Sequence, residues 1–100
     1  MANPIATITI PTANVIDSVQ PCQICDKEGR WWFTVYANSA QHVYTWKEGE
    51  STATDIGAFT NARGSLGVGV DGKLYLFTFE ESGKARPLLV YQIDGYVAPA

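Results

Sequence analysis

The residues best equipped for chemistry in this chain are two cysteines and one histidine. Cys22 and Cys25 form a Cys-x-x-Cys motif, a spacing found in thiol oxidoreductases and in structural zinc sites. Thioredoxin-like chemistry needs this motif at a helix N-terminus, but here Pro21 precedes it and strand-forming residues surround it. A zinc site would need two further ligands, and only His42 is available unless subunits share the metal. We therefore interpret the cysteines as small apolar side chains with free thiols, and we predict no metal site and no cofactor.

The remaining residues that could act in catalysis lack a catalytic context. His42 begins a strand-like segment, where a lone histidine is more often a packed or exposed ring than a base. The acid pairs Glu48 with Glu50 and Glu80 with Glu81 lie at or beside turns, which favours a solvated surface. The sequence has neither a Gly-x-Ser-x-Gly elbow nor a phosphate-binding glycine loop. We therefore predict that the chain is not an enzyme and has no catalytic residues.

Aromatic residues are the strongest remaining signal for a binding site. The chain has three Trp, five Tyr and four Phe among its 100 residues. Most of them must form the core, because a small β domain needs large side chains to bury enough area. A tryptophan on an exposed strand face, next to an acid or an amide, can stack on a sugar ring or anchor a protein partner. The candidate ligand-binding residues are Trp32, Trp46, Tyr36, Tyr75 and Arg30.

Two parts of the sequence resemble each other. Residues 29–36 and 72–79 both read as a glycine, a cation and six strand-forming residues. Residues 42–46 and 89–93 form a second pair, and a glycine follows each of them. The copies are 43 residues apart in the first pair and 47 in the second, so the second copy has four extra residues in its connecting turn. A strand-rich period of about 40 to 50 residues is typical of a β-propeller blade.

Strand patterns run along the whole chain, whereas helical periodicity is nearly absent. Residues 5–10 alternate Ile or Ala with Thr and end at Pro11, which predicts a half-buried or edge strand. Residues 15–19 predict another short strand. Residues 31–36 are bulky on both faces, which predicts a strand covered on both sides. The dipeptide Asp71-Gly72, between two strand-like segments, predicts a hairpin with a type I′ turn.

The sequence therefore predicts a single all-β domain over residues 1–100. The alternatives are two blade-like antiparallel sheets, as in a propeller repeat, or a small β-sandwich. Two blades cannot close a ring, so the first alternative requires copies of the chain to associate, most simply as a trimer. Residues 55–59 could form a short outer strand between the repeats, with a loop after it. The predicted parts are an extended N-terminal arm or strand at 1–18, repeat 1 at 19–50, a connection at 51–65 and repeat 2 at 66–95.

Charge and composition exclude several kinds of partner. The formal net charge is −3, from ten acids and seven scattered bases, so we expect neither nucleic acid nor a membrane surface as a partner. With 46% hydrophobic and 12% aromatic residues, the chain should fold. The N-terminus lacks the cationic start and apolar run of a signal peptide. We expect synthesis in a cytoplasm without a signal peptide, which is compatible with a virion assembled inside a cell.

Residues 19–50 and 66–95 resemble the blades of small lectins whose two-blade chains trimerise into a six-bladed propeller. The likeness lies in the order of a short apolar strand, a glycine turn, an aromatic-rich strand and a further strand. The resemblance implies glycan binding, which fucose-binding members perform with an arginine, an acid and a tryptophan between adjacent blades. Arg30 precedes its strand, and Ile93 stands in the second copy where Trp46 stands in the first, so this chain departs from that pattern.

A second class of protein fits the same features. A short, acidic, all-β chain with an extended Thr/Ile arm at residues 4–12 and an apolar tail at 96–100 looks like a structural or decoration protein of a bacteriophage capsid or tail. Such an arm would add a strand to a neighbouring subunit. The function predicted from the sequence is thus a non-catalytic, self-associating β module for binding or assembly, with glycan recognition as one role and a virion component as the alternative.

Overall fold

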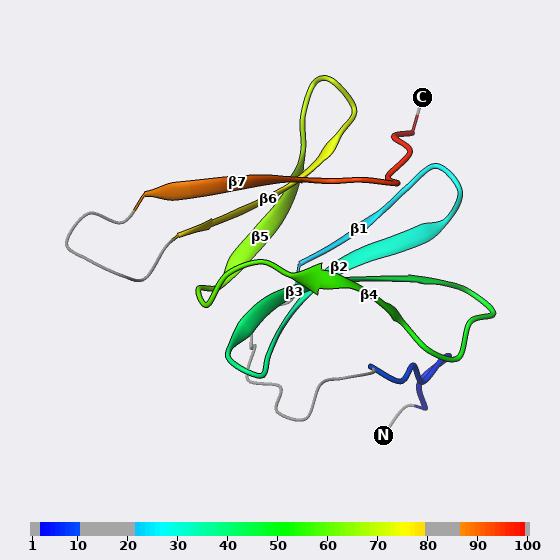
Figure 1. Cartoon of the computed structure of the whole chain (residues 1–100). Coiled ribbons are helices and arrows are strands. Elements are labelled where there is room, and N and C mark those ends of the chain that lie inside the picture. Colours follow the sequence, from blue (N-terminus) through cyan, green and yellow to red (C-terminus); the bar gives the residue numbers. More distant parts are fainter. Residues whose placement is uncertain (1–2, 11–21, 80–86, 100) are drawn as a thin grey trace.

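The computed structural model describes residues 3–10, 22–79 and 87–99 (Figure 1). These residues form two antiparallel sheets and contain no helix, which confirms the predicted all-β class and the presence of two sheets. The four-stranded sheet, here called sheet 1, has the order β1-β2-β3-β4, and the three-stranded sheet 2 has the order β5-β6-β7. The strands are β1 (Gln23–Cys25), β2 (Arg30–Ala37), β3 (Ala40–Lys47), β4 (Thr54–Ala58), β5 (Gly64–Val68), β6 (Leu74–Phe79) and β7 (Leu88–Ile93).

Each sheet is a meander, because every strand pairs with its neighbour in sequence. The β2–β3 hairpin turns at Asn38 and Ser39, whose φ angles of 53° and 61° are those of a type I′ turn. The β5–β6 hairpin lies where the sequence predicted it, but the predicted type I′ turn at Asp71-Gly72 is wrong. Of these two residues only Gly72 has a positive φ, 76°. The Asp71 carboxylate instead accepts a hydrogen bond from the Lys73 amide at 3.0 Å, which stabilises a longer loop.

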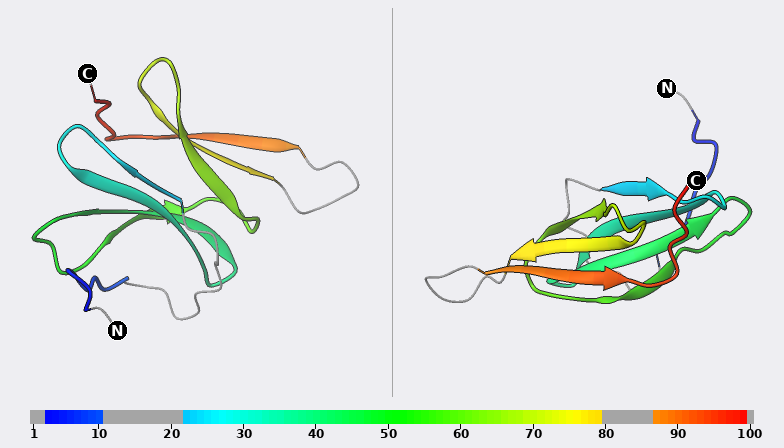
Figure 2. Two further views of the ribbon diagram at one scale, coloured as in Figure 1. Left: turned by 180° about the vertical axis from the view of Figure 1, so that it is seen from behind. Right: turned by 90° about the horizontal axis from the view of Figure 1, so that it is seen from above.

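The two sheets form two layers with a shared core between them (Figure 1; Figure 2, left). The face of sheet 1 that meets sheet 2 is called its inner face, and the opposite face its outer face. A second cluster lies on the outer face of sheet 1, where Ile8 and Ile10 pack against Val35 and Tyr44. Side chains on both faces of β2 are therefore buried, as predicted for residues 31–36. The buried residues of the shared core are Trp32, Val43, Leu66, Leu74, Leu76 and Ile93.

The N-terminal residues differ from their prediction. Residues 5–10 were expected to form a strand, but the structure gives them one isolated parallel bridge, between Thr9 and Thr52. The Thr9 amide donates to the carbonyl of Ser51 at 3.1 Å, and the Ala53 amide donates to the carbonyl of Thr9 at 2.9 Å. The segment is held mainly because its alternate isoleucines cover the outer face of sheet 1, rather than by a ladder of hydrogen bonds. The short strand predicted at 15–19 lies outside the described residues.

The segment between the predicted repeats contains more strand than the sequence indicated. The possible outer strand at 55–59 is present as β4, which runs from Thr54 to Ala58 and pairs with β3. The loop expected after it is short, because β5 already begins at Gly64. A Cβ atom on Gly64 would lie 2.4 Å from the carbonyl oxygen of Phe77, so only glycine fits where β5 and β6 come together.

Candidate functional site

Two of the predicted binding residues belong to the core. Trp32 is only 3% exposed, and its indole Nε1 donates to the Asp26 carboxylate at 3.1 Å. Tyr36 is also buried, with its hydroxyl donating to the carbonyl of Asn61 and its ring 4.5 Å from the guanidinium carbon of Arg63. In this conformation neither side chain offers a face to a ligand.

Asp26 organises the turn between β1 and β2. Its Oδ1 accepts hydrogen bonds from the amides of Glu28 and Arg30, each at 2.9 Å, while Oδ2 accepts the one from Trp32. Burial by itself would raise the pKa of this carboxyl, but the hydrogen bonds from Trp32 and the two amides outweigh it and hold the pKa below its ordinary value of 3.8. Gly29 completes the turn with a φ of 82°. The buried Trp32 is thus part of a structural unit with the turn.

Arg30, the first residue of β2, is held by an ion pair. Its guanidinium contacts both carboxylate oxygens of Glu50, at 2.9 and 3.2 Å, and lies 3.4 Å from the hydroxyl of Thr45. The hydrogen bond to Glu50 raises the pKa of Arg30, and the same bond lowers the pKa of Glu50. Glu50 also accepts from the Lys47 amide at 2.9 Å. Arg30 thereby fixes the loop after β3.

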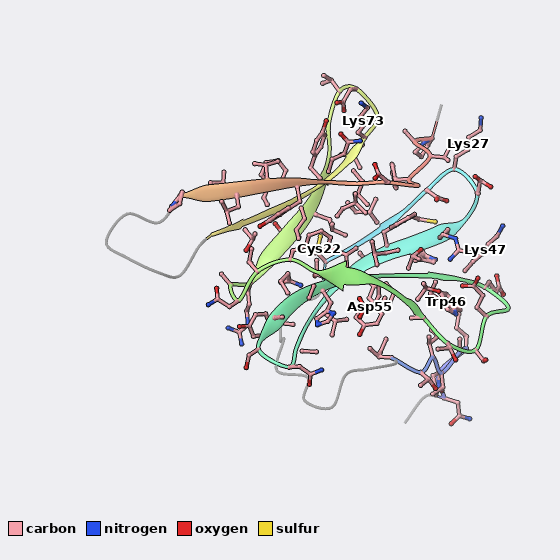
Figure 3. The ribbon with its side chains drawn as sticks, viewed as in Figure 1. Cys22, Lys27, Trp46, Lys47, Asp55 and Lys73 are labelled. Atoms are coloured by element: carbon pink, nitrogen blue, oxygen red, sulfur yellow. The ribbon has the colours of Figure 1, made fainter. Side chains whose placement is uncertain are left out.

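Trp46 lies in a groove on the outer face of sheet 1, the side that faces the N-terminal residues (Figure 3). Its indole Nε1 donates to the carbonyl of Glu50 at 2.6 Å, which fixes the ring beside the loop. Trp31 pairs directly opposite Trp46 in the β2–β3 ladder and is 40% exposed. The groove therefore presents two neighbouring indoles. It is lined by Ile5, Ala6, Thr7, Gly29, Trp31, Trp46, Glu48, Gly49, Glu50 and Ser51.

Trp31 was not among the residues predicted from the sequence. The signal that identifies it is the two-residue turn at Asn38 and Ser39, which sets the β2–β3 register and places Trp31 across from Trp46. A turn one residue longer would shift this pairing. Of the predicted residues, the structure brings Trp46 to the groove and Arg30 to its edge through Glu50, whereas Tyr75 lies on the other sheet.

Tyr75 belongs to the outer face of sheet 2. Its hydroxyl donates to the Asp71 carboxylate at 2.5 Å, and this hydrogen bond raises the pKa of the tyrosine. Phe77 is its neighbour, with ring centroids 6.5 Å apart. A Cβ atom on Gly67 would lie 3.7 Å from the Phe77 ring, and one on Gly69 would lie 3.1 Å from the Tyr75 ring. Gly69 thus makes room for the Tyr75 ring, whereas a side chain at Gly67 would meet Phe77 only at an ordinary contact distance.

An apolar surface continues from these rings across the outer face of sheet 2. Val90 pairs opposite Phe77 in the β6–β7 ladder, and Leu88 lies two residues before Val90, on the same face. The exposed fractions are 39% for Phe77, 52% for Leu88 and 52% for Val90. We call Tyr75, Phe77, Leu88 and Val90 the apolar face. Within the described residues its members stay at least partly exposed, whereas Ile8 and Ile10 cover part of the outer face of sheet 1.

The cysteines and the histidine are separated by the fold. Strand alternation sends Cys22 and Cys25 to opposite faces, where Cys22 donates to the carbonyl of Leu66 at 3.6 Å and Cys25 to that of Asp26 at 3.7 Å. His42 is buried, with Nδ1 at 3.1 Å from the Asp55 carboxylate. Among the described residues, no three potential metal ligands of the His, Cys, Asp or Glu type lie together.

Comparisons of this chain with protein-family models, with curated proteins and with solved structures found no match. Over residues 3–10, 22–79 and 87–99 the structure contains no helix long and apolar enough to cross a membrane.

Proposed function

We propose that this chain is a non-catalytic β module that associates with copies of itself. The observation that supports this most strongly is the apolar face of sheet 2, where Phe77, Leu88 and Val90 lie exposed side by side. Single exposed apolar residues are ordinary, but a contiguous group of them on a flat sheet is typical of an interaction surface.

The rest of the molecule agrees with an assembly role. None of the four residues of the apolar face carries a charge, so a second apolar surface could cover them without burying a charged side chain of the face itself. A chain of 100 residues also buries a modest core by itself, and association would add to it. A virion component would use the same property, so self-association is common to both functions considered from the sequence.

The molar mass in solution tests this proposal. We expect size-exclusion chromatography with light scattering to give a mass above that of one chain, rising with concentration. Phe77→Asp places a charge in the middle of the apolar face and should reduce the mass to that of the monomer. Val70→Asp is the matched control, because Val70 is fully exposed in the β5–β6 loop, outside the apolar face. A monomeric wild-type protein at all concentrations would contradict the proposal.

A second candidate function, glycan recognition, is favoured by the groove at Trp31 and Trp46. Two adjacent indoles offer apolar ring surfaces that can stack on the C–H face of a sugar. The exposed carboxylate of Glu48 and backbone groups of Gly49 lie in the same groove and can hydrogen-bond to hydroxyl groups. This combination of an apolar floor and polar rim is what a neutral sugar requires.

Binding of glycans can be measured by tryptophan fluorescence and on a glycan array. We expect a sugar that binds to quench the fluorescence of the wild-type protein, and Trp46→Ala or Trp31→Ala to abolish the array signal. Tyr75→Phe is the control, because Tyr75 lies on the other sheet and the substitution removes only its hydroxyl. An array without any binding sugar would remove this candidate and leave self-association untouched.

A further inference from the structure

The turn before β2 in sheet 1 and the turn before β6 in sheet 2 have the same pattern of backbone hydrogen bonds. In the turn before β2, the Asp26 amide donates to the carbonyl of Arg30 at 2.8 Å, and the Gly29 amide donates to the carbonyl of Asp26 at 3.1 Å. In the turn before β6, the amide at position 69 donates to the carbonyl at 73 at 3.0 Å, and the amide at 72 donates to the carbonyl at 69 at 2.9 Å. These equivalent turns are 43 residues apart, the offset of the sequence repeat.

This equivalence relates the faces of the two sheets. Counting from the turns, Trp32 corresponds to Tyr75 and Thr34 to Phe77. Trp32 and Thr34 are buried on the inner face of sheet 1, whereas Tyr75 and Phe77 lie on the outer face of sheet 2. The apolar face of sheet 2 is thus the counterpart of a face that is already buried within the chain.

The partner of that buried face can be identified in the same way. The inner face of sheet 1 packs against the side of sheet 2 that carries Leu74 and Leu76. These residues correspond to Trp31 and Phe33, which lie on the outer face of sheet 1. Within one chain, therefore, the inner face of sheet 1 packs against the face of sheet 2 that is the counterpart of the outer face of sheet 1. The two sheets are thus stacked with their equivalent faces pointing in the same direction.

We propose that a second copy of the chain continues this stacking, with the apolar face of sheet 2 in one copy docked on the outer face of sheet 1, around Trp31, in the next. The proposal rests on the proposed function, since it names the partner and the surfaces of that self-association. The proposal is based on the packing inside each chain, because the counterparts of these two faces already pack against each other between sheet 1 and sheet 2. The contact is head-to-tail, so each copy has one surface of each kind, and such contacts produce a closed ring or an open filament.

The N-terminal residues occupy part of the surface that the next copy would cover. Ile8 and Ile10 pack against Val35 and Tyr44 on the outer face of sheet 1, and the isolated bridge at Thr9 holds them. Trp31 remains 40% exposed beside them. In the isolated chain, residues 3–10 therefore cover part of the surface that the next copy covers in the assembly. Docking of a second copy displaces them.

A mixing experiment tests the head-to-tail contact. Phe77→Asp blocks the apolar face, and Trp31→Asp blocks the outer face of sheet 1. We expect each variant alone to be monomeric by light scattering, and an equimolar mixture to form dimers, because one intact surface of each kind remains. If the Trp31→Asp variant associates like the wild type while Phe77→Asp does not, the apolar face pairs with itself, and the head-to-tail contact is wrong although self-association stands. If the wild type is monomeric throughout, both proposals fail.

Weakening the N-terminal contact provides a test that does not depend on the folding of the Trp31→Asp variant. Ile8→Ser should loosen residues 3–10 and lower the dissociation constant of the assembly several-fold, because less has to be displaced. Val70→Ser is the matched control, since Val70 is fully exposed in the β5–β6 loop, outside both docking surfaces, and it should leave the dissociation constant unchanged. An unchanged or higher dissociation constant for Ile8→Ser, in a protein with the wild-type circular dichroism spectrum, would overturn the proposed displacement.

Discussion

Replacing Asp26 tests how strongly the β1–β2 turn stabilises the fold. The carboxylate accepts three hydrogen bonds, from two backbone amides and the Trp32 indole, and Asp26 itself is buried. A hydrogen bond to a charged group contributes about 1.5 to 3 kcal/mol, and neighbouring bonds of this kind are not additive. We therefore expect Asp26→Ala to lower the free energy of unfolding by about 3 to 4 kcal/mol. That is a large fraction of the roughly 5 to 15 kcal/mol that stabilises a typical domain.

Asp26→Asn removes the negative charge of the side chain but keeps nearly the same size and shape. Its amide group can keep the two backbone hydrogen bonds through the oxygen, but its NH₂ group meets the Trp32 N–H, so that two donors face each other. We expect a loss of about 2 kcal/mol at pH 7, measured by urea denaturation with circular dichroism and tryptophan fluorescence. Asp94→Asn is the control, because Asp94 is an exposed carboxylate and its replacement should have almost no effect.

The pH dependence gives this prediction a second readout. The pKa of Asp26 is lowered on folding, so its contribution is present above the ordinary value of 3.8 and is lost as the pH falls through the lower value of the folded state. The difference in stability between the wild type and Asp26→Asn should therefore shrink as the solution is acidified below about pH 4. A difference that is absent at pH 7, or that stays constant into acid, would refute the role given to this carboxylate.

Three further predictions concern the turns, the strand packing and the surface charges. Ser39→Gly should raise the free energy of unfolding by about 0.5 to 1 kcal/mol, because the serine has a φ of 61° that glycine adopts without strain; a decrease in urea denaturation would contradict this. Gly64→Ala should destabilise the protein severely, since its Cβ would lie 2.4 Å from a carbonyl oxygen of the next strand, whereas Gly67→Ala meets only an ordinary contact at 3.7 Å; equal melting temperatures for the two would refute the packing. Glu50→Gln breaks the exposed ion pair with Arg30 and should lower the melting temperature only slightly, by an amount that disappears at high salt.

The sequence predicted the parts of the fold that local patterns control. Asp71-Gly72 identified the β5–β6 hairpin, although not its turn type, and the bulky residues of 31–36 on both faces predicted that the strand would be covered on both sides. Local patterns do not contain the packing of one sheet on the other. Alternation places Trp31 and Trp32 on opposite faces, but only the stacking of the sheets decides that Trp32 is buried and Trp31 remains accessible.

The candidate groove was only partly predictable for a related reason. Trp46 was identified as a candidate from its residue type, whereas Trp31 became one through the register of the β2–β3 hairpin. That register depends on a two-residue turn, which forces Ser39 into the left-handed region, and serine is not a residue that signals such a turn. Likewise, the alternating residues 5–10 indicated a strand, but tertiary packing on the outer face of sheet 1 replaced the expected ladder.

Solvent reactivity of Phe77 at rising protein concentration tests most directly whether the apolar face mediates self-association. Hydroxyl-radical footprinting followed by mass spectrometry reports the exposure of this side chain, with Val70 in the adjacent loop as an internal reference. We predict that Phe77 becomes protected as the concentration increases, while Val70 remains reactive. A Phe77 side chain that is equally reactive at every concentration would contradict the account.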